Sequence, residues 1–343
     1  MELTDRQKLI LTLIIHEHIR SAQPVGSKTL VEKYNLAMSS ATVRNEMALL
    51  TDYNLLRQPH TSAGRVPTEE GYRFFVRNLV QKTGLATTTR RTITHQFYQS
   101  RQDVEQWLKL AASVLAKQSQ AASLVTAPHS EKAIFKHLEL IATQGRQVLM
   151  VLVMMGGEIR QQFISLAEPV SQDRLSEIAN QLSDMCVRCD AQAISRLKSQ
   201  VDPLGKDILD ILITEMSLTE EAATGEIYLD GMTNVLSEPE FAESDEARQA
   251  LRVLEERSLL ENLLASTVMN ADVGGIQVLI GGEGTWEELR RCSLVLARYG
   301  DPESLTGSVG VLGPIRMPYD HTISTVRFVA NVLSDLVSET LAV

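Results

Sequence analysis

Near the amino terminus the hydrophobic positions repeat with the period of an α-helix, broken by short polar turns. Thr4 and Gln7 match the Ser/Thr-x-x-Glu/Gln pattern that caps a helix, and apolar residues then recur at helical spacing. The polar run 21–26 ends this helix, and Ser27 is placed to cap a shorter helix that reaches about Tyr34. The pattern therefore predicts two successive helices separated by a turn.

A third helix is predicted to start at Ser39 or Ser40, since either hydroxyl can accept a hydrogen bond from a first-turn amide. At 100° per residue, the face toward the core consists of Val43, Met47 and Leu50. The opposite face is low and polar and consists of Ala41, Arg44, Asn45 and Ala48. Small residues allow close approach, and Arg and Asn can bind guanine and adenine bidentately in the major groove. The second and third helices together predict a helix-turn-helix.

A short hairpin is predicted directly after this helix. Residues 55–59 form the first strand, 62–65 the turn, and Val66 begins the return strand, while Pro59 favours an edge position. The loop contains no acidic residue, and it carries Arg57, His60, Thr61, Ser62 and Arg65. Such a basic wing is typical of contacts to phosphates or to the minor groove. Thr68 then caps another helix, although the same layout also occurs in small domains that bind protein.

Period-two patterns appear further along the chain. They predict strands at 137–142, 147–155 and 158–166, and again at 276–280, 292–297 and 308–312, with a possible short strand at 226–229. Helical patterns cover 107–124, 172–185, 203–216, 244–264 and 319–336. Strands, then a helical block, then more strands predict an α+β, multidomain chain whose sheet domain is interrupted by an insertion.

Charge separates the amino-terminal segment from the rest. Residues 1–91 carry 13 Lys/Arg against 8 Asp/Glu, whereas residues 92–343 carry 20 against 35. This asymmetry predicts that only the amino-terminal segment contacts nucleic acid. The longest apolar run, 148–155, is far shorter than the roughly 20 residues of a membrane span, and charged residues begin at once, so a cytoplasmic protein without membrane contact is expected.

At this point the motifs resemble a known family. The runs SSATVRNEMALL and PHTSAGRVPTEEGYRFFV, and later YLDGMTNVLSEPEF, IGGE and GVLGPIRMPYDHTISTVRFVANVLSDLVSE, are similar to those of the heat-inducible transcription repressor family, HrcA. The resemblance implies a dimeric repressor that binds an inverted-repeat operator of double-stranded DNA upstream of chaperonin (GroE-type) and DnaK-type chaperone operons. It also implies that a GroEL-type chaperonin supports the activity, and that repression is lost at high temperature because the dimer loses its fold.

The resemblance also sharpens the expected domain organisation. It implies an N-terminal winged helix-turn-helix over 1–82, a linker over 83–100, and a GAF-like antiparallel sheet domain in two parts, 101–186 and 271–343. Between those parts, 187–270 is expected to form an inserted, mostly helical dimerisation domain. The amino-acid pattern alone supports only an interruption of the sheet domain.

The expected DNA-binding residues fall into groups by role. Arg44 and Asn45 are predicted to contact bases, while Ser39, Ser40 and Thr42 position the helix. The residues expected to contact the backbone or the minor groove are Lys28, Arg57, His60, Thr61, Ser62 and Arg65.

Other motifs do not support a catalytic, cofactor or metal site. Cys186 and Cys189 form a lone CxxC, whereas a structural zinc site needs four ligands; ordinary thiols are the simpler interpretation, with redox sensing as the alternative. Gly281 to Gly284 lacks the spacing of a phosphate loop and is typical of a turn. Since no nucleophile elbow, HExxH or paired-carboxylate signal is present, no enzyme is predicted. The remaining alternative is a ligand-sensing winged-helix regulator that uses its GAF-like domain.

Overall fold

The computed structural model describes residues 2–60, 63–80, 84–99, 103–129, 133–155, 157–221, 225–241, 252–254, 256–268, 273–302 and 305–341. The architecture is α+β, as predicted. The chain divides into two compact units. The first consists of Met1–Ala127, Glu226–Tyr299 and Ser308–Thr340, and the second of Pro128–Gly225, Gly300–Gly307 and Leu341–Val343.

The amino-terminal part of the first unit, which we call the head, has the predicted element order. It contains α1 (Asp5–Ser21), α2 (Ser27–Tyr34), α3 (Ser40–Asp52), β1 (Leu56–Arg57), β2 (Val66–Pro67) and α4 (Glu69–Asn78). The strands β1 and β2 pair antiparallel, and α3 packs against α1 and α2. The predicted stripe of α3, Val43, Met47 and Leu50, is buried. The core of the head therefore follows directly from the helical spacing of its apolar residues.

Most predicted helix caps in the head are confirmed. Thr4 and Gln7 form the reciprocal capping box of α1, and Thr68 accepts a hydrogen bond from the Gly71 amide at the start of α4. Of the two serines before α3, Ser39 is the cap. The prediction that Ser27 caps α2 is wrong, because Gly26 occupies that position and Ser27 is the first helical residue.

Two predictions after the head change in the structure. Residues 83–100, predicted to be a linker or a helix extension, contain the helix α5 (Thr87–Gln99), which buries Ile93 and Phe97 and packs against α6 (Val104–Ser119). The helix expected to reach residue 124 ends earlier, since Gln120 adopts a left-handed backbone conformation (φ 49°). The next residues form β3 (Ala122–Thr126), a fully buried strand.

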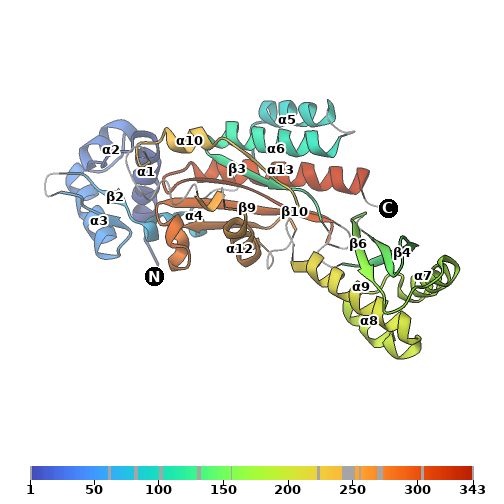
Figure 1. Cartoon of the computed structure of the whole chain (residues 1–343). Coiled ribbons are helices and arrows are strands. Elements are labelled where there is room, and N and C mark those ends of the chain that lie inside the picture. The colour runs from blue at the N-terminus through green and yellow to red at the C-terminus, as the bar shows by residue number, and fades with distance from the viewer. Residues whose placement is uncertain are drawn as a thin grey trace. The chain divides into compact units, whose positions relative to one another are not determined.

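The remainder of the first unit is built around an antiparallel sheet. Its strand order is β7 (Ile227–Asp230), β3, β10 (Thr306–Pro314), β9 (Cys292–Gly300) and β8 (Ile276–Ile280). Figure 1 shows α6 and α13 (Tyr319–Thr340) over one face and α12 (Arg257–Val268) over the other. Leu260, Leu263 and Leu264 of α12 join sheet residues such as Leu294 and Leu312 in one hydrophobic cluster. This layered sheet is compatible with a GAF-like domain.

Short elements complete the first unit. They are α10 (Met232–Leu236) and the 3₁₀ turns η2 (Gly281–Gly284) and η3 (Glu287–Leu289). Gly281 has φ 66° in η2, in agreement with the predicted turn. The helix predicted over 244–264 lies partly outside the described residues, and α12 covers its carboxyl-terminal part.

The second unit contains a three-strand meander, in the order β4 (Phe135–Ala142), β5 (Gln147–Met154) and β6 (Ile159–Ser165), within its described residues. Its helices are α7 (Gln172–Cys186), α8 (Ala191–Leu197) with the adjoining turn η1 (Lys198–Gln200), and α9 (Pro203–Glu221). One face of the meander is buried with these helices in a single hydrophobic cluster.

The compact units divide the chain at residues other than those expected from the sequence. The insertion was expected over 187–270, whereas the second unit begins at Pro128 and its longest segment ends at Gly225. The physical reason is that β4, β5 and β6 bury their apolar face against the following helices instead of joining the larger sheet. Within the described part of the chain, no helix is both long enough and apolar enough to cross a membrane.

Candidate nucleic-acid interface

The outward side of α3 presents the residues that the pattern predicted. Arg44, Asn45, Ala41 and Ala48 are exposed. Glu46, the acidic residue of this stretch, is turned aside, because Arg6 Nη1 lies 3.3 Å from its Oε1 and Gln7 Nε2 donates to its Oε2 at 3.2 Å. The exposed face therefore combines small, amide and cationic side chains with one neutralised carboxylate.

The amino-terminal end of α3 is held by Ser39. Its Oγ accepts from the Thr42 amide at 3.1 Å and lies 2.9 Å from Thr42 Oγ1. Ser39 and Ser40 are exposed at the first turn. Other first-turn amides of a helix lack intrahelical acceptors and favour an anion such as a phosphate. Ser39 thus caps the start of the helix through Thr42, while a role of Ser39, Ser40 and Thr42 in positioning the helix on DNA stays a prediction.

A hollow of about 360 Å³ brings together three of the predicted cationic residues. It is lined by Lys28 from α2, Arg44 from α3 and Arg65 directly before β2, and Gln58 and Gly64 also line it. These residues are up to 37 positions apart in the sequence. Their convergence produces a concave, positively charged surface beside the exposed face of α3.

Backbone pairing holds the β1–β2 ribbon against the turn between α1 and α2. Val25 and Arg65 exchange two backbone hydrogen bonds of 2.8 Å. A Cβ atom at Gly64 would lie 2.3 Å from the Val25 carbonyl oxygen, so this approach requires glycine. Arg65 Nε donates to Thr51 Oγ1 at 3.1 Å, which directs the arginine toward the end of α3. The ribbon is therefore fixed to the helices.

The tip of the ribbon is only partly described. His60 is exposed and its carbonyl accepts from the Ala63 amide at 2.9 Å, while Gln58 Nε2 donates to the Ala63 carbonyl at 3.1 Å. Thr61 and Ser62, two predicted contact residues, lie outside the described residues.

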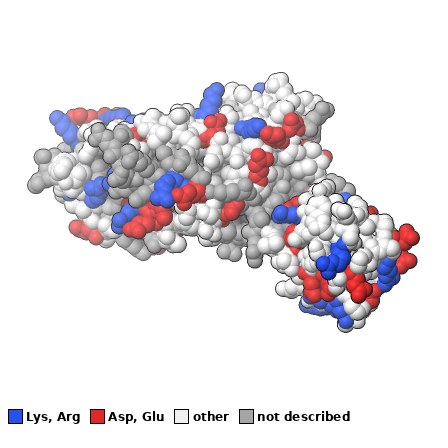
Figure 2. Space-filling model, viewed as in Figure 1, with Lys and Arg blue, Asp and Glu red and all other residues white. Residues whose placement is uncertain are grey.

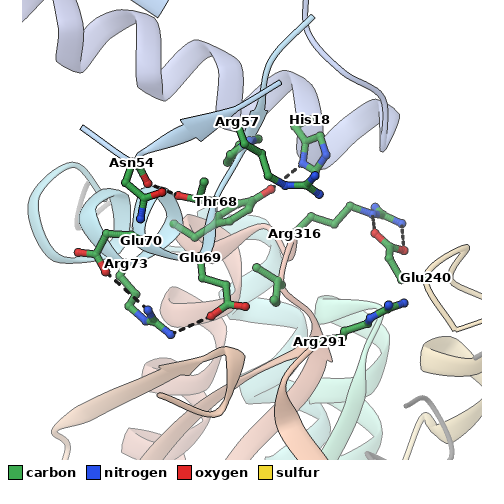
Figure 3. A pocket seen from close by; sticks show the side chains of 13 residues that line it. His18, Asn54, Arg57, Thr68, Glu69, Glu70, Arg73, Glu240, Arg291 and Arg316 are labelled. Atoms are coloured by element: carbon green, nitrogen blue, oxygen red, sulfur yellow. Dashed lines mark hydrogen bonds and ion pairs between the residues drawn. The ribbon is translucent and has the colours of Figure 1, made fainter. Parts of the chain in front are cut away.

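Arg57 is not brought together with the other predicted cations. It lines a second hollow of about 720 Å³ with His18, Tyr72 and Arg316, while the neighbouring Gln58 lines the first. Figure 3 shows Arg57 beside His18, on the side of the head that meets the large sheet. Arg57 is the last residue of β1 and Gln58 lies just beyond it, and the two side chains line different hollows.

His18, which no motif of the sequence marks as functional, is a half-buried residue that lines this second hollow. Its Nδ1 lies 2.7 Å from the Tyr72 hydroxyl. Burial lowers the pKa of His18 to about 4, and the charges of Arg316 and Arg57 add to the shift while Glu240 opposes it. The imidazole is therefore neutral at neutral pH. No periodic or motif signal marked this pair, since the two residues are 54 positions apart.

Charge over the head is mixed. Figure 2 shows basic and acidic side chains interspersed over the visible face of the head. The positive charge of the concave surface therefore depends on where Lys28, Arg44 and Arg65 lie, as well as on the net charge of the head.

The CxxC segment forms a turn at the end of α7. Cys186 and Cys189 are free thiols, and burial raises the pKa of Cys186 to about 11. A thiol with a raised pKa is a poor nucleophile and metal ligand. Within the described ranges of the chain, no group of three or more His, Cys, Asp and Glu residues is arranged to hold a metal ion.

Comparisons with known proteins point to the same family as the sequence motifs. Residues 105–323 match the family described as HrcA protein C terminal domain. A relative from Roseiflexus castenholzii is 43% identical, covering 98% of this chain and 95% of its own length, and one from Thermomicrobium roseum is 41% identical, covering 99% and 97%. Both are named heat-inducible transcription repressor HrcA. A crystal structure of a hypothetical protein shares the fold, with a TM-score of 0.63, 24% identity, and coverage of 99% of this chain and 100% of the other.

The class that these relatives define is that of transcription repressors. The chain belongs to the HrcA family, since both the family match and the relatives extend over most of its length.

Proposed function

We propose that this chain is a cytoplasmic, homodimeric repressor of heat-shock operons that binds an inverted-repeat operator in double-stranded DNA. The head acts as a winged helix-turn-helix, with α3 in the major groove and the β1–β2 ribbon as the wing. The observation that carries this proposal is the convergence of Lys28, Arg44 and Arg65 around one hollow beside the exposed face of α3.

Within this proposal the residues of the head have distinct roles. Arg44 and Asn45 contact base edges, and Ser39, Ser40 and Thr42 position α3 against the backbone. The phosphate or minor-groove contacts are made by Lys28, His60, Thr61, Ser62 and Arg65. Arg57 lines the other hollow, so the support for a DNA contact by Arg57 is weaker than for these residues.

Two heads are needed to bind an inverted repeat, because the two-fold axis of a dimer matches that of the operator. The second unit has exposed apolar side chains on the outer face of β4, β5 and β6, which could serve a second copy. Phe163 and Ile159 are 65% and 56% exposed there, and each lies opposite an apolar residue of β5, Leu149 and Val153 respectively. An exposed apolar sheet face of this kind favours association with a second copy.

The direct test is selection of genomic DNA by the purified protein. Fragments bound at moderate salt should share one inverted repeat located in promoters of chaperone operons. Arg44→Ala should reduce the enrichment and relax the shared sequence, whereas Arg77→Ala, which changes an exposed arginine of α4 outside both hollows, should retain the enrichment. Recovery of unrelated fragments, or of none, by the folded wild-type protein would refute the proposal.

In this proposal, repression is lost on heating because the dimer unfolds. The dimer is marginally stable, a GroEL-type chaperonin refolds it, and repression falls when the chaperonin is occupied by other clients. Operator binding should therefore be lost on brief heating and restored by chaperonin with ATP. If chaperonin gave no recovery, this part of the proposal would fail while DNA recognition would stand.

A ligand-sensing regulator is the alternative function. The hollow of about 720 Å³ favours it, since its size suits a small molecule and several polar groups line it. Against it, the arginines Arg73 and Arg316 already pair with carboxylates of the chain itself. A metabolite that raises the melting temperature of the wild-type protein in a concentration-dependent way would favour this alternative.

A further inference from the structure

Arg316 connects the head to the large sheet within the first unit. It lies between β10 and α13, and its side chain is only 13% exposed. Nη1 donates to the carbonyl oxygen of Ile19 in the last turn of α1, at 3.2 Å. The other nitrogens pair with the carboxylates of Glu240 and Glu238 (Figure 3 shows the first pair). One guanidinium thus joins α1 to the segment that follows α10.

A second connection lies on α4. Arg73 Nη2 donates to the carbonyl oxygen of Ile280, the last residue of β8, at 2.7 Å, and also to Glu69 Oε2 at 3.1 Å. The start of α4 and the residue after β8 approach closely here, since a Cβ atom at Gly281 would lie 2.5 Å from Glu69 Oε2. Arg73 and Arg316 therefore hold the head at separate points.

Between the two connections lies the hollow of about 720 Å³. Apolar contact across the junction includes Tyr72 and Tyr319, whose ring centroids are 5.9 Å apart. Because part of the junction is hollow, close packing alone does not fix the orientation of the head on the sheet. That orientation then depends on directed hydrogen bonds, and the planar guanidinium of Arg316 supplies several of them in fixed geometry.

We propose that Arg316 is a positioning residue that fixes the orientation of the head on the sheet and thereby sets the half-site spacing that the dimer accepts. The inference rests on the proposed function, because spacing matters only to a protein that binds an inverted repeat. In a two-fold dimer the distance between recognition helices is a geometric property that half-site spacing must match. Loosening one connection widens the range of that distance without removing any contact to a base.

The experiment measures affinity for a series of operators whose central spacer is lengthened or shortened by single base pairs. The wild-type protein should lose affinity by about tenfold or more when the spacer changes by two base pairs. Arg316→Gln should lose less than about threefold over the same change, with weaker binding at the best spacing. Arg316→Lys, which keeps the charge but not the planar donors, should lie between them. Arg77→Gln is the control with the same loss of charge, and its spacing profile should match the wild type.

A second measurement, made without DNA, tests whether Arg316 holds the head on the sheet. Amide hydrogen exchange should become faster in α4 and in the last turn of α1 in Arg316→Gln, while exchange in the buried strand β3 stays unchanged. Glu240→Gln removes the charge of one partner of Arg316 and one of its two acceptor oxygens, and it should change both readouts in the same direction. An unchanged spacing profile in a folded Arg316→Gln dimer would overturn the inference, as would unchanged exchange. If the wild-type protein bound no inverted repeat, the proposed function would fail, and the exchange data would still decide whether Arg316 docks the head.

Discussion

The cationic side chains around the hollow beside α3 divide between two proposed roles, and the division determines what each substitution should do. Arg44 lies on the exposed side of α3, whereas Arg65 comes from the residue before β2 and its Nε donates to Thr51 Oγ1 of α3. We expect Arg44→Ala to weaken operator binding by about 1–3 kcal/mol and to relax sequence preference, because a base contact is lost. Arg65→Ala should weaken binding to operator and random DNA alike. Fluorescence anisotropy with both DNAs measures the difference, and equal losses for the two variants would contradict the division.

His18 gives a prediction on pH dependence. Its pKa is about 4 in the folded protein against an ordinary value of 6.5, so between these values the unfolded chain binds a proton that the folded chain does not. Stability is therefore full above pH 6.5 and falls as the pH drops toward 4, by an amount on the order of 2 kcal/mol. The groups that face His18 are Arg316, Arg57, Glu240 and Tyr72.

Urea unfolding at pH 7 and pH 5 measures this effect. His18→Gln should lose less stability than the wild type between these two pH values, because the glutamine does not titrate. The lowered pKa of Glu17 acts only below its ordinary value of 4.5, outside this window. Identical pH dependence in the two proteins would show that His18 is not the group responsible.

The sequence alone predicted the positions of residues whose contacts lie close by in the chain. The Ser39 cap and the buried stripe of α3 depend on neighbours within one or two helical turns, so periodicity predicted them. The side on which Arg57 lies depends on the two-residue strand β1 and on segments more than 200 positions away. The partners of Arg316 are equally remote. Such contacts leave no local signal in a single sequence.

Among the elements, the ribbon depends on a glycine. Gly64→Ala would place a Cβ atom 2.3 Å from the Val25 carbonyl oxygen, so the ribbon must move away from the turn between α1 and α2. We expect a loss of about 1–3 kcal/mol in stability and weaker binding to all DNA sequences. Gly84→Ala has nothing within 4 Å and should change stability by less than about 0.5 kcal/mol. Thermal unfolding of both variants provides the comparison, and a stable Gly64→Ala protein with normal affinity would disprove the role assigned to this contact.

Two elements that the sequence did not predict, α5 and β3, are stabilised by packing on other elements more than by a pattern of their own. The polar stretch that forms α5 has Ile93 and Phe97 as its buried residues, and it is stabilised by packing on α6. The strand β3 follows α6 almost directly, and its partners β7 and β10 lie about 100 and 180 positions further on. An apolar run of this length fits the end of a helix as well as a buried strand. In the structure, the left-handed Gln120 marks the point where α6 ends and the chain turns into β3.

At the scale of the whole molecule, the division into units differs from the expected one because composition does not reveal which sheet a strand joins. The alternating pattern of residues correctly predicted β4 to β6 as strands. The same pattern would also suit strands of the larger sheet, so it did not show which sheet they join. These strands are buried with α7, α8 and α9, so Pro128–Gly225 forms a unit in which sheet and helices share one core. A proposed dimerisation surface is therefore better sought on this unit's sheet than on helices alone.

The outer face of that sheet supports a final prediction on assembly. Phe163, 65% exposed, lies opposite Leu149, which in turn lies opposite Ile141 of β4, so an apolar row crosses all three strands. If this row is buried between two copies, Phe163→Asp should raise the dimer dissociation constant by about 30-fold, or about 2 kcal/mol, because a desolvated aromatic anchor is replaced by a charge.

Gln162→Asp, which adds the same charge to the other side of β6, is the matched control and should leave the dimer intact. Sedimentation velocity measures the association, and operator binding should fall in parallel while binding to a single half-site at high protein concentration persists. A Phe163→Asp protein that remained dimeric would mean that the two heads are joined through another surface. In that case the spacing set by Arg316 would be measured across that other interface, although the orientation of each head on its own sheet would be unchanged.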